Sequence, residues 1–204
     1  SESGSSLLRL MQNNDTARLD LLVRESLQNC LDAGDKDSGY ESVKVDFVTG
    51  KFDTEELSCN FDKIDHSLNE KYPGKRDYIA IRDTNTTGLT GPIRYEDVEN
   101  NKFGNFLKLV YEISKPQDQS GSGGSWGLGK TVYFRVGIGL VIYYSRVKKT
   151  DDNYESRLAA ALVEDETKTD TLLPEGTGPQ RGIAWWGALD FGNKKCSEKF
   201  GSTK

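Results

Sequence analysis

Near the start of the chain, a carboxylate and a carboxamide stand one helical turn apart. Glu25 and Asn29 are separated by four residues, and Asp32 follows three residues later. At 100° per residue these side chains lie within about 60° of one another on a helix. A metal ion held through the Asn29 oxygen and a water molecule polarised by Glu25 would then lie side by side. A polar helix face that simply meets water is the alternative interpretation of this spacing.

A second candidate begins at Asp83, where residues 83–89 are DTNTTGL. A carboxylate at the end of a strand can accept a hydrogen bond from a ligand amine. Asn85 and Gly88 tolerate the positive φ that a tight turn against a ligand requires. An ordinary Asx-turn explains the same residues, so this segment by itself leaves both interpretations open.

A third candidate is the glycine-rich segment of residues 121–131, GSGGSWGLGKT, which runs into a predicted helix. Exposed backbone N–H groups and a helix N-terminus suit a polyphosphate. A flexible linker is the alternative, but a plain Gly/Ser linker would not carry large apolar and basic side chains. The segment therefore favours phosphate binding by Gly124, Trp126, Gly127, Leu128, Gly129, Lys130 and Thr131.

Residues 124–131 also satisfy the Walker A pattern of P-loop proteins. A true P-loop joins a buried strand to its helix, whereas residues 114–120, SKPQDQS, cannot form a core strand. Residues 158–165, LAAALVED, could supply a Walker B strand that ends in an acid. A P-loop nucleoside triphosphatase therefore remains an alternative.

Periodicity and end signals predict the elements that must position these residues. A helix is expected from residue 15 or 16 to residue 33, with Gly34 as its stop. Further helices are expected at residues 105–114 and 130–136, and strands at 43–48, 78–82, 139–147, 157–164 and 182–190. Residues 51–76 are interpreted as an irregular polar insertion and residues 115–124 as a mobile loop.

The length of 204 residues suits one domain with one core. An apolar fraction of 35% and a charged fraction of 29% are typical of a folded core that carries long polar loops. The formal net charge of -5 argues against a nucleic acid or an anionic membrane as a direct partner.

Three cysteines, Cys30, Cys59 and Cys196, lack the spacing of a disulfide framework or a zinc site. A reducing cytoplasmic compartment is therefore expected. No apolar stretch approaches the roughly 20 residues of a membrane-spanning helix, and the first residues lack signal-peptide character. Because the chain begins without Met and ends in a polar stretch, we expect a domain of a longer protein.

In this order, the three candidate segments resemble the N, G1 and G2 boxes of the gyrase, heat-shock chaperone, histidine kinase and MutL (GHKL) superfamily. Residues 24–33, RESLQNCLDA, are similar to the N box, and residues 124–130, GSWGLGK, to the G2 box. Residues 83–88 are similar to the G1 box, although the family's Asp-x-Gly-x-Gly has gained a residue and Asn85 replaces its first Gly. The resemblance extends over residues 7–190.

The resemblance implies a role for each residue of the N-box-like segment. Glu25 would activate the attacking water molecule, and Asn29 would be a ligand of Mg²⁺. Asp32 and Ala33 would border the nucleotide pocket. The polar face of this helix would accordingly be buried against ligand.

For the other segments, the resemblance implies that Asp83 accepts the adenine amino group, with Gly88 and Leu89 completing the turn. The glycine-rich segment would hold the phosphates, residues 93–129 would form an ATP lid, and Thr177 would back the adenine. The implied architecture is a two-layer α/β (α+β) sandwich of the Bergerat type. In it, a mixed β-sheet carries the helices on one face.

Glu25 favours the hydrolytic branch of the superfamily, because sensor histidine kinases generally lack an acid at this place. The only histidine, His66, lies in the polar insertion rather than in a phosphoacceptor helix. The resemblance implies Mg²⁺-dependent ATP binding and slow hydrolysis, which would switch a lid and drive conformational change or dimerisation. ATP, a second copy or a flanking domain are the implied partners; a nucleotide-sensing module that hardly hydrolyses ATP is the alternative.

Overall fold

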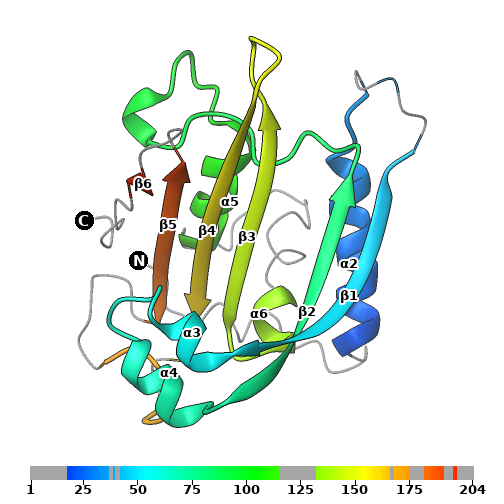
Figure 1. Ribbon diagram of the computed structural model, residues 1–204. Coiled ribbons are helices and arrows are strands. Elements are labelled where there is room, and N and C mark those ends of the chain that lie inside the picture. Colours follow the sequence, from blue (N-terminus) through cyan, green and yellow to red (C-terminus); the bar gives the residue numbers. More distant parts are fainter. Residues whose placement is uncertain are drawn as a thin grey trace, which may run out of the picture.

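The computed structural model describes residues 18–36, 39, 42–114, 132–165, 168–174, 182–190 and 195–196, which form layered helices and strands (Figure 1). In chain order the elements are α2 (Arg18–Asp32), β1 (Lys44–Asp53), α3 (Thr54–Ser58), α4 (Asp65–Lys71), β2 (Lys75–Thr84), the 3-10 helix η1 (Tyr95–Asp97), α5 (Gly104–Ser114), α6 (Val132–Val136), β3 (Leu140–Lys148), β4 (Tyr154–Val163), β5 (Ile183–Asp190) and β6 (Lys195–Cys196). Within these residues, no helix has the length and apolar character needed to cross a lipid bilayer.

β1 and β2 form a two-stranded antiparallel sheet. Lys44 lies opposite Thr84 at one end of the ladder and Asp53 opposite Lys75 at the other. Both strands were expected from their alternating residues, and both are longer than expected because they pair with each other along their whole length. The register places the end of β2 beside the start of β1.

The expectation of an irregular insertion at residues 51–76 was wrong, because this segment contains α3 and α4. The Asp53 side chain caps α3 by accepting a hydrogen bond from Glu55 N–H at 3.0 Å. Phe61, Ile64 and Leu68 of this segment are at most 4% exposed. Their spacing of three and four residues is a helical period, but the polar residues between them concealed it in the sequence.

β3, β4, β5 and β6 form a second antiparallel sheet in that order. Leu140 lies opposite Leu162 between β3 and β4, and Leu158 lies opposite Ala188 between β4 and β5. The strands expected at residues 139–147, 157–164 and 182–190 are thereby confirmed. The short strand β6 was not expected.

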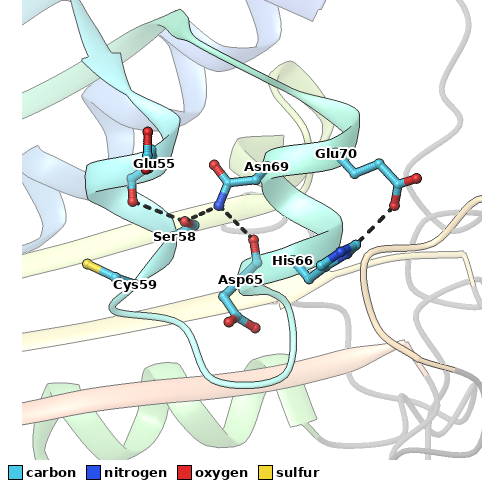
Figure 2. Close-up of a pocket in the computed structure, with 7 residues that line it drawn as sticks. All are labelled: Glu55, Ser58, Cys59, Asp65, His66, Asn69 and Glu70. Carbon is cyan, nitrogen blue, oxygen red and sulfur yellow. Dashed lines mark hydrogen bonds and ion pairs between the residues drawn. The ribbon is translucent and has the colours of Figure 1, made fainter.

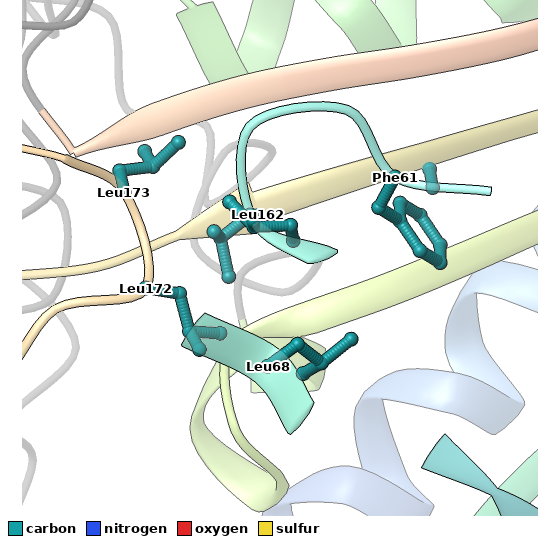
Figure 3. Close-up of a cluster of buried hydrophobic side chains, with 7 residues drawn as sticks. Phe61, Leu68, Leu162, Leu172 and Leu173 are labelled. Atoms are coloured by element: carbon teal, nitrogen blue, oxygen red, sulfur yellow. The ribbon is translucent and has the colours of Figure 1, made fainter. Parts of the chain in front are cut away.

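The second sheet is covered on both faces. α5 and α6 pack on one face, where Ile113 and Phe134 contact Ala161 and Val163 of β4. On the other face lies a second cluster made by Phe61, Ile64, Ala160, Leu162, Leu68, Leu172 and Leu173 (Figure 3). β4 is therefore buried on both sides, which explains its nearly continuous apolar sequence.

The mixed α and β composition of the expected fold is confirmed, and its arrangement differs in two respects. The described strands form two antiparallel sheets rather than one mixed sheet, since β2 pairs with β1 and β3 with β4. Helices cover both faces of the larger sheet, because α4 supplies the second layer that the expected irregular insertion would have lacked.

α2 confirms the first predicted helix and ends at Asp32, two residues before the predicted stop at Gly34. Leu22, Ser26 and Cys30 are buried on the side of α2 that faces the molecule. The apolar row on the other side is exposed to 62, 41, 39 and 63% at Leu19, Val23, Leu27 and Leu31. The inner side of this helix is thus the more polar one.

Candidate functional site

The inner side of α2 carries the first group of candidate residues. Ser26 is buried, and Glu25 and Asn29 beside it are half-buried. Asp32 is exposed, and its Oδ1 accepts a hydrogen bond from Gln28 Nε2 at 2.8 Å. Asp32 lies nearly one turn beyond Asn29, the residue that contacts α6, and the protein itself leaves it uncovered.

Backbone hydrogen bonds join the end of α2 to the turn after β2. Thr87 N–H donates to the Ala33 carbonyl at 2.9 Å, and Asp35 N–H donates to the Asn85 carbonyl at 2.9 Å. An isolated antiparallel bridge lies between these two bonds. The first and second candidate segments are therefore in direct contact through their main chains.

Asp83 lies at the end of β2, beside Cys30 of α2. Its Oδ1 accepts a hydrogen bond from Thr86 Oγ1 at 3.0 Å, and its carboxylate accepts another from the Cys30 thiol. Burial, followed by the charge of Asp83 and by this hydrogen bond, raises the pKa of Cys30 from 9.0 to about 12. Because Asp83 itself is exposed, its carboxylate is held in place where a ligand amine can reach it.

The turn after β2 uses the positive φ values expected from its sequence, 65° at Asn85 and 72° at Gly88. Asn85 Nδ2 also donates to the Ser42 carbonyl at 2.9 Å, close to the start of β1. A β-carbon on Gly88 would lie 2.5 Å from Ser145 Oγ, which accepts a hydrogen bond from Leu89 N–H at 2.9 Å. Both conformation and space therefore require glycine at residue 88.

Two polar side chains fasten this turn to the larger sheet and to α5. Arg157 of β4 is 9% exposed and donates to the carbonyls of Leu89 at 2.6 Å and Gly91 at 2.8 Å. Its Nε lies 2.6 Å from Glu155, which balances the charge of the buried guanidinium. Asn105 of α5 donates to a carbonyl of the same turn at 2.9 Å. The turn is thus held from three sides, by β3, β4 and α5.

α6 brings Tyr133 against the inner side of α2. The Tyr133 hydroxyl accepts a hydrogen bond from Asn29 Nδ2 at 3.1 Å. Burial raises the pKa of Tyr133 above its usual 10.0, and the hydrogen bond from Asn29 offsets part of the rise. The Tyr143 hydroxyl of β3 is buried without a hydrogen-bond partner in the described part of the chain, and burial raises the pKa of Tyr143 as well.

The glycine-rich segment and Thr177 lie outside the described residues. This includes Gly124, Trp126, Gly127, Leu128, Gly129, Lys130 and Thr131. α6 begins at Val132, the next residue, so the helix that directly follows the segment is the one tied to α2. Of the expected lid at residues 93–129, residues 93–114 are described and contain η1 and α5.

A shallow depression of about 640 Å³ lies away from this site, between α3 and α4 (Figure 2). Asn69 Nδ2 donates to Ser58 Oγ at 2.5 Å there, and His66 Nδ1 lies 3.8 Å from a Glu70 oxygen. No cluster of three or more His, Cys, Asp or Glu that could hold a metal occurs in the described ranges. The polar contacts of this depression join two short helices, so we assign it a structural role.

Several residues of the site were not recognised in the sequence. Ser26 and Cys30 were overlooked because small residues on a helix give no chemical signal by themselves. Tyr133 and Arg157 come from α6 and β4, far along the chain from their partners. The one usable signal was Arg157, a charged residue at the start of an apolar strand, where a buried charge needs partners.

No protein-family model, curated protein or solved structure matches this chain. The function must therefore be argued from the geometry of the site itself.

Proposed function

We propose that the chain binds ATP with Mg²⁺ between α2, the turn after β2 and the start of α6, and that Glu25 assists ATP hydrolysis. The observation that carries this proposal is the meeting of three segments distant in sequence. α2 contacts the turn through Ala33 and Thr87, and contacts α6 through Asn29 and Tyr133. The first two segments were singled out by their own chemistry, and α6 directly follows the third, so these contacts support one shared site.

Asp83 supports the part of the proposal that concerns the base. A fixed carboxylate can accept a hydrogen bond from an exocyclic amine, such as that of adenine. The hydrogen bonds from Thr86 and Cys30 hold the Asp83 carboxylate in one orientation without covering it. Orientation of this kind lowers the entropy cost of binding a ligand.

The oxygen atoms on α2 fit the cation that ATP carries. Mg²⁺ is usually bound through one or two side chains, with the remaining ligands supplied by phosphates and water. Asn29 offers one side-chain oxygen atom on the inner side of α2, one turn from Glu25. A single protein ligand suits a cation whose other ligands come from a nucleotide and water. Mg²⁺ would neutralise charge on the phosphates.

Glu25 is the residue proposed to take a proton from the attacking water molecule. Its Oε1 lies 3.2 Å from the Arg24 guanidinium, and the two side chains are 25% and 66% exposed, respectively. An exposed ion pair of this kind is weak, because water screens it. The Glu25 carboxylate can therefore leave Arg24 and accept a proton when nucleotide is bound.

The strand order does not favour the alternative P-loop site. β4 would have to be the Walker B strand, yet it pairs antiparallel with β3 and β5. The strand–loop–helix unit of P-loop proteins belongs to parallel βαβ architectures. α5 also ends at Ser114, ten residues before the first glycine of the Walker-like pattern.

A titration with ATP, with and without Mg²⁺, tests the binding proposal. At a ligand concentration a hundredfold above Kd, the folded state should gain about 2.7 kcal/mol of stability. Asp83→Asn should abolish this gain, since an amide NH₂ group can take the place of the acceptor facing the ligand. Asp77→Asn is the matched control, because Asp77 also lies on β2 and its side chain is 80% exposed.

Retained ATP affinity in Asp83→Asn would show that this residue does not recognise the base. Absence of any response in folded wild-type protein would refute the proposed function.

Hydrolysis is tested separately with Glu25→Ala and with the control Asp20→Ala, another acidic residue of α2. Glu25→Ala should keep ATP affinity within about twofold and lower turnover by about 10²-fold or more, the usual range for removal of a general base. Asp20→Ala should change neither the ATP affinity nor the turnover. Unchanged turnover in Glu25→Ala would favour the nucleotide-sensing alternative, and loss of ATP binding would mean that Glu25 has a structural role.

A further inference from the structure

The orientation of the Asn29 side chain decides what it can bind. One end of a carboxamide is an oxygen that accepts hydrogen bonds and binds cations, and the other is an NH₂ group that repels them. The two ends have nearly the same shape, so their positions are fixed by neighbouring donors and acceptors. For Asn29, that neighbour is Tyr133 of α6.

The neighbour of the Asn29 carboxamide is the Tyr133 hydroxyl, which accepts a hydrogen bond from Asn29 Nδ2 at 3.1 Å. Ser26 is 0% exposed and donates its hydroxyl hydrogen to the Leu22 carbonyl at 2.5 Å. Since a serine hydroxyl has one hydrogen, Ser26 has none left for the Tyr133 oxygen, whose lone pairs remain for Asn29 Nδ2.

The hydrogen bond from Nδ2 to Tyr133 leaves the other end of the carboxamide available. Asn29 Oδ1 accepts no hydrogen bond from the described part of the chain. We propose that Tyr133 is a positioning residue, which turns the Asn29 carboxamide so that Oδ1 is the atom offered to the divalent cation of a bound nucleotide. The cation part of this inference rests on the proposed function, whereas the orientation of the carboxamide does not.

The surroundings of Tyr133 suit this task. Its hydroxyl lies 3.1 Å from Asn29 Nδ2, across the contact between α6 and α2. Tyr133 is also the second residue of α6, two residues after Thr131. One side chain thus joins the proposed cation ligand to the helix that follows the glycine-rich segment.

The test compares Tyr133→Phe with wild type by calorimetric titration of a non-hydrolysable ATP analogue in EDTA and in Mg²⁺. Tyr133→Phe should leave the affinity in EDTA within about twofold. It should reduce the gain in affinity from Mg²⁺ by about tenfold or more, as expected when the partner of a metal ligand is removed. Tyr143→Phe is the matched control, because it removes a buried hydroxyl that has no partner in the described part of the chain.

A second background separates positioning from a general structural effect. In Asn29→Asp, both side-chain oxygens are alike, so either one can face a cation without being turned by Tyr133. Adding Tyr133→Phe to Asn29→Asp should therefore cause no further loss of the Mg²⁺ effect. A further tenfold loss in this background would overturn the positioning role.

An apo-state measurement makes the orientation testable without nucleotide. Solvent exchange of the Asn29 side-chain NH₂ group, followed by NMR, should be slow in wild type and faster in Tyr133→Phe. Equal exchange in both, or an equal loss of affinity with and without Mg²⁺, would overturn the inference alone. If the wild type binds nucleotide with no effect of Mg²⁺, the proposed function fails, and the cation role of Tyr133 fails with it.

Discussion

Gly88 is the residue whose replacement should disturb the site most directly. Its φ of 72° belongs to the left-handed region, and its missing β-carbon makes room for Ser145 Oγ. That oxygen in turn holds Leu89 N–H. Both the left-handed conformation of residue 88 and the hydrogen bond between Ser145 and Leu89 therefore require glycine at this place.

Gly88→Ala should lower the free energy of unfolding by about 2–3 kcal/mol, of which about 1–2 kcal/mol is left-handed strain and about 1 kcal/mol a displaced hydrogen bond. Gly74→Ala isolates the strain, because Gly74 has φ of 75° and no atom within 4 Å of a built β-carbon. Urea unfolding measures both variants. Equal losses of unfolding free energy in the two variants would mean that Ser145 can move away from the new β-carbon without destabilising the fold.

Cys30 should make stability depend on alkaline pH. Its pKa rises from 9.0 in an unfolded chain to about 12 in the folded one, so the folded state favours the protonated thiol. This contribution is complete below pH 9 and is lost as the pH rises toward 12, with a slope of up to about 1.4 kcal/mol per pH unit. Cys30→Ala should therefore lose less stability than wild type between pH 9 and 11 in urea unfolding. Parallel curves would contradict the assigned burial of the thiol and its contact with Asp83.

At the scale of elements, α2 shows that the more apolar side of a helix is not always the inner one. Its inner side carries Ser26, Asn29 and Cys30 next to Leu22, because these residues meet Tyr133 and Asp83. Its outer side carries the exposed apolar row that begins at Leu19. A helix with polar side chains on its inner face gives up part of its usual hydrophobic anchoring.

A pair of leucines on α2 tests this assignment of its two sides. Leu22 is 2% exposed and Leu31 is 63% exposed. Leu22→Ala should cost about 3 kcal/mol, whereas Leu31→Ala should stay within about 0.5 kcal/mol of wild type. Chemical denaturation of the two variants gives both values, and the reverse ranking would show that α2 packs through its outer row.

At the scale of the whole molecule, the segment between β1 and β2 is part of the core. Leu68 of α4 is 0% exposed within the cluster on the larger sheet, and Phe61 meets Trp186 of β5 edge to face at 5.2 Å. The smaller sheet is therefore connected to the larger one through its inserted helices. The chain should unfold as one cooperative unit rather than lose this segment first.

Leu68→Ala should cost about 3 kcal/mol, while His66→Ala on the same helix should cost less than about 0.5 kcal/mol. His66 is the control because its side chain is 90% exposed. Tryptophan fluorescence and far-UV circular dichroism should report the same midpoint in each variant. Separate midpoints would show that the segment folds independently of the larger sheet.

The elements with long, regular patterns could be predicted from the sequence, because local periodicity determines them. This applies to α2, α5 and the longer strands. The contacts that build the site could not be predicted in this way, since Asn29 and Tyr133 are 104 residues apart. The division into two sheets and the core role of Leu68 also depend on packing between distant segments. A short stretch of sequence carries no information on such packing.

The turn after β2 also bears on how this sequence can change over time. Its shape is set by main-chain bonds between Ala33 and Thr87 and between Asp35 and Asn85, together with the φ angles of Asn85 and Gly88. Asn85, Thr86 and Thr87 add side-chain hydrogen bonds to this main-chain frame, so a substitution that keeps the path of the turn still removes a hydrogen bond. This turn should therefore tolerate fewer substitutions than an exposed loop of the same length.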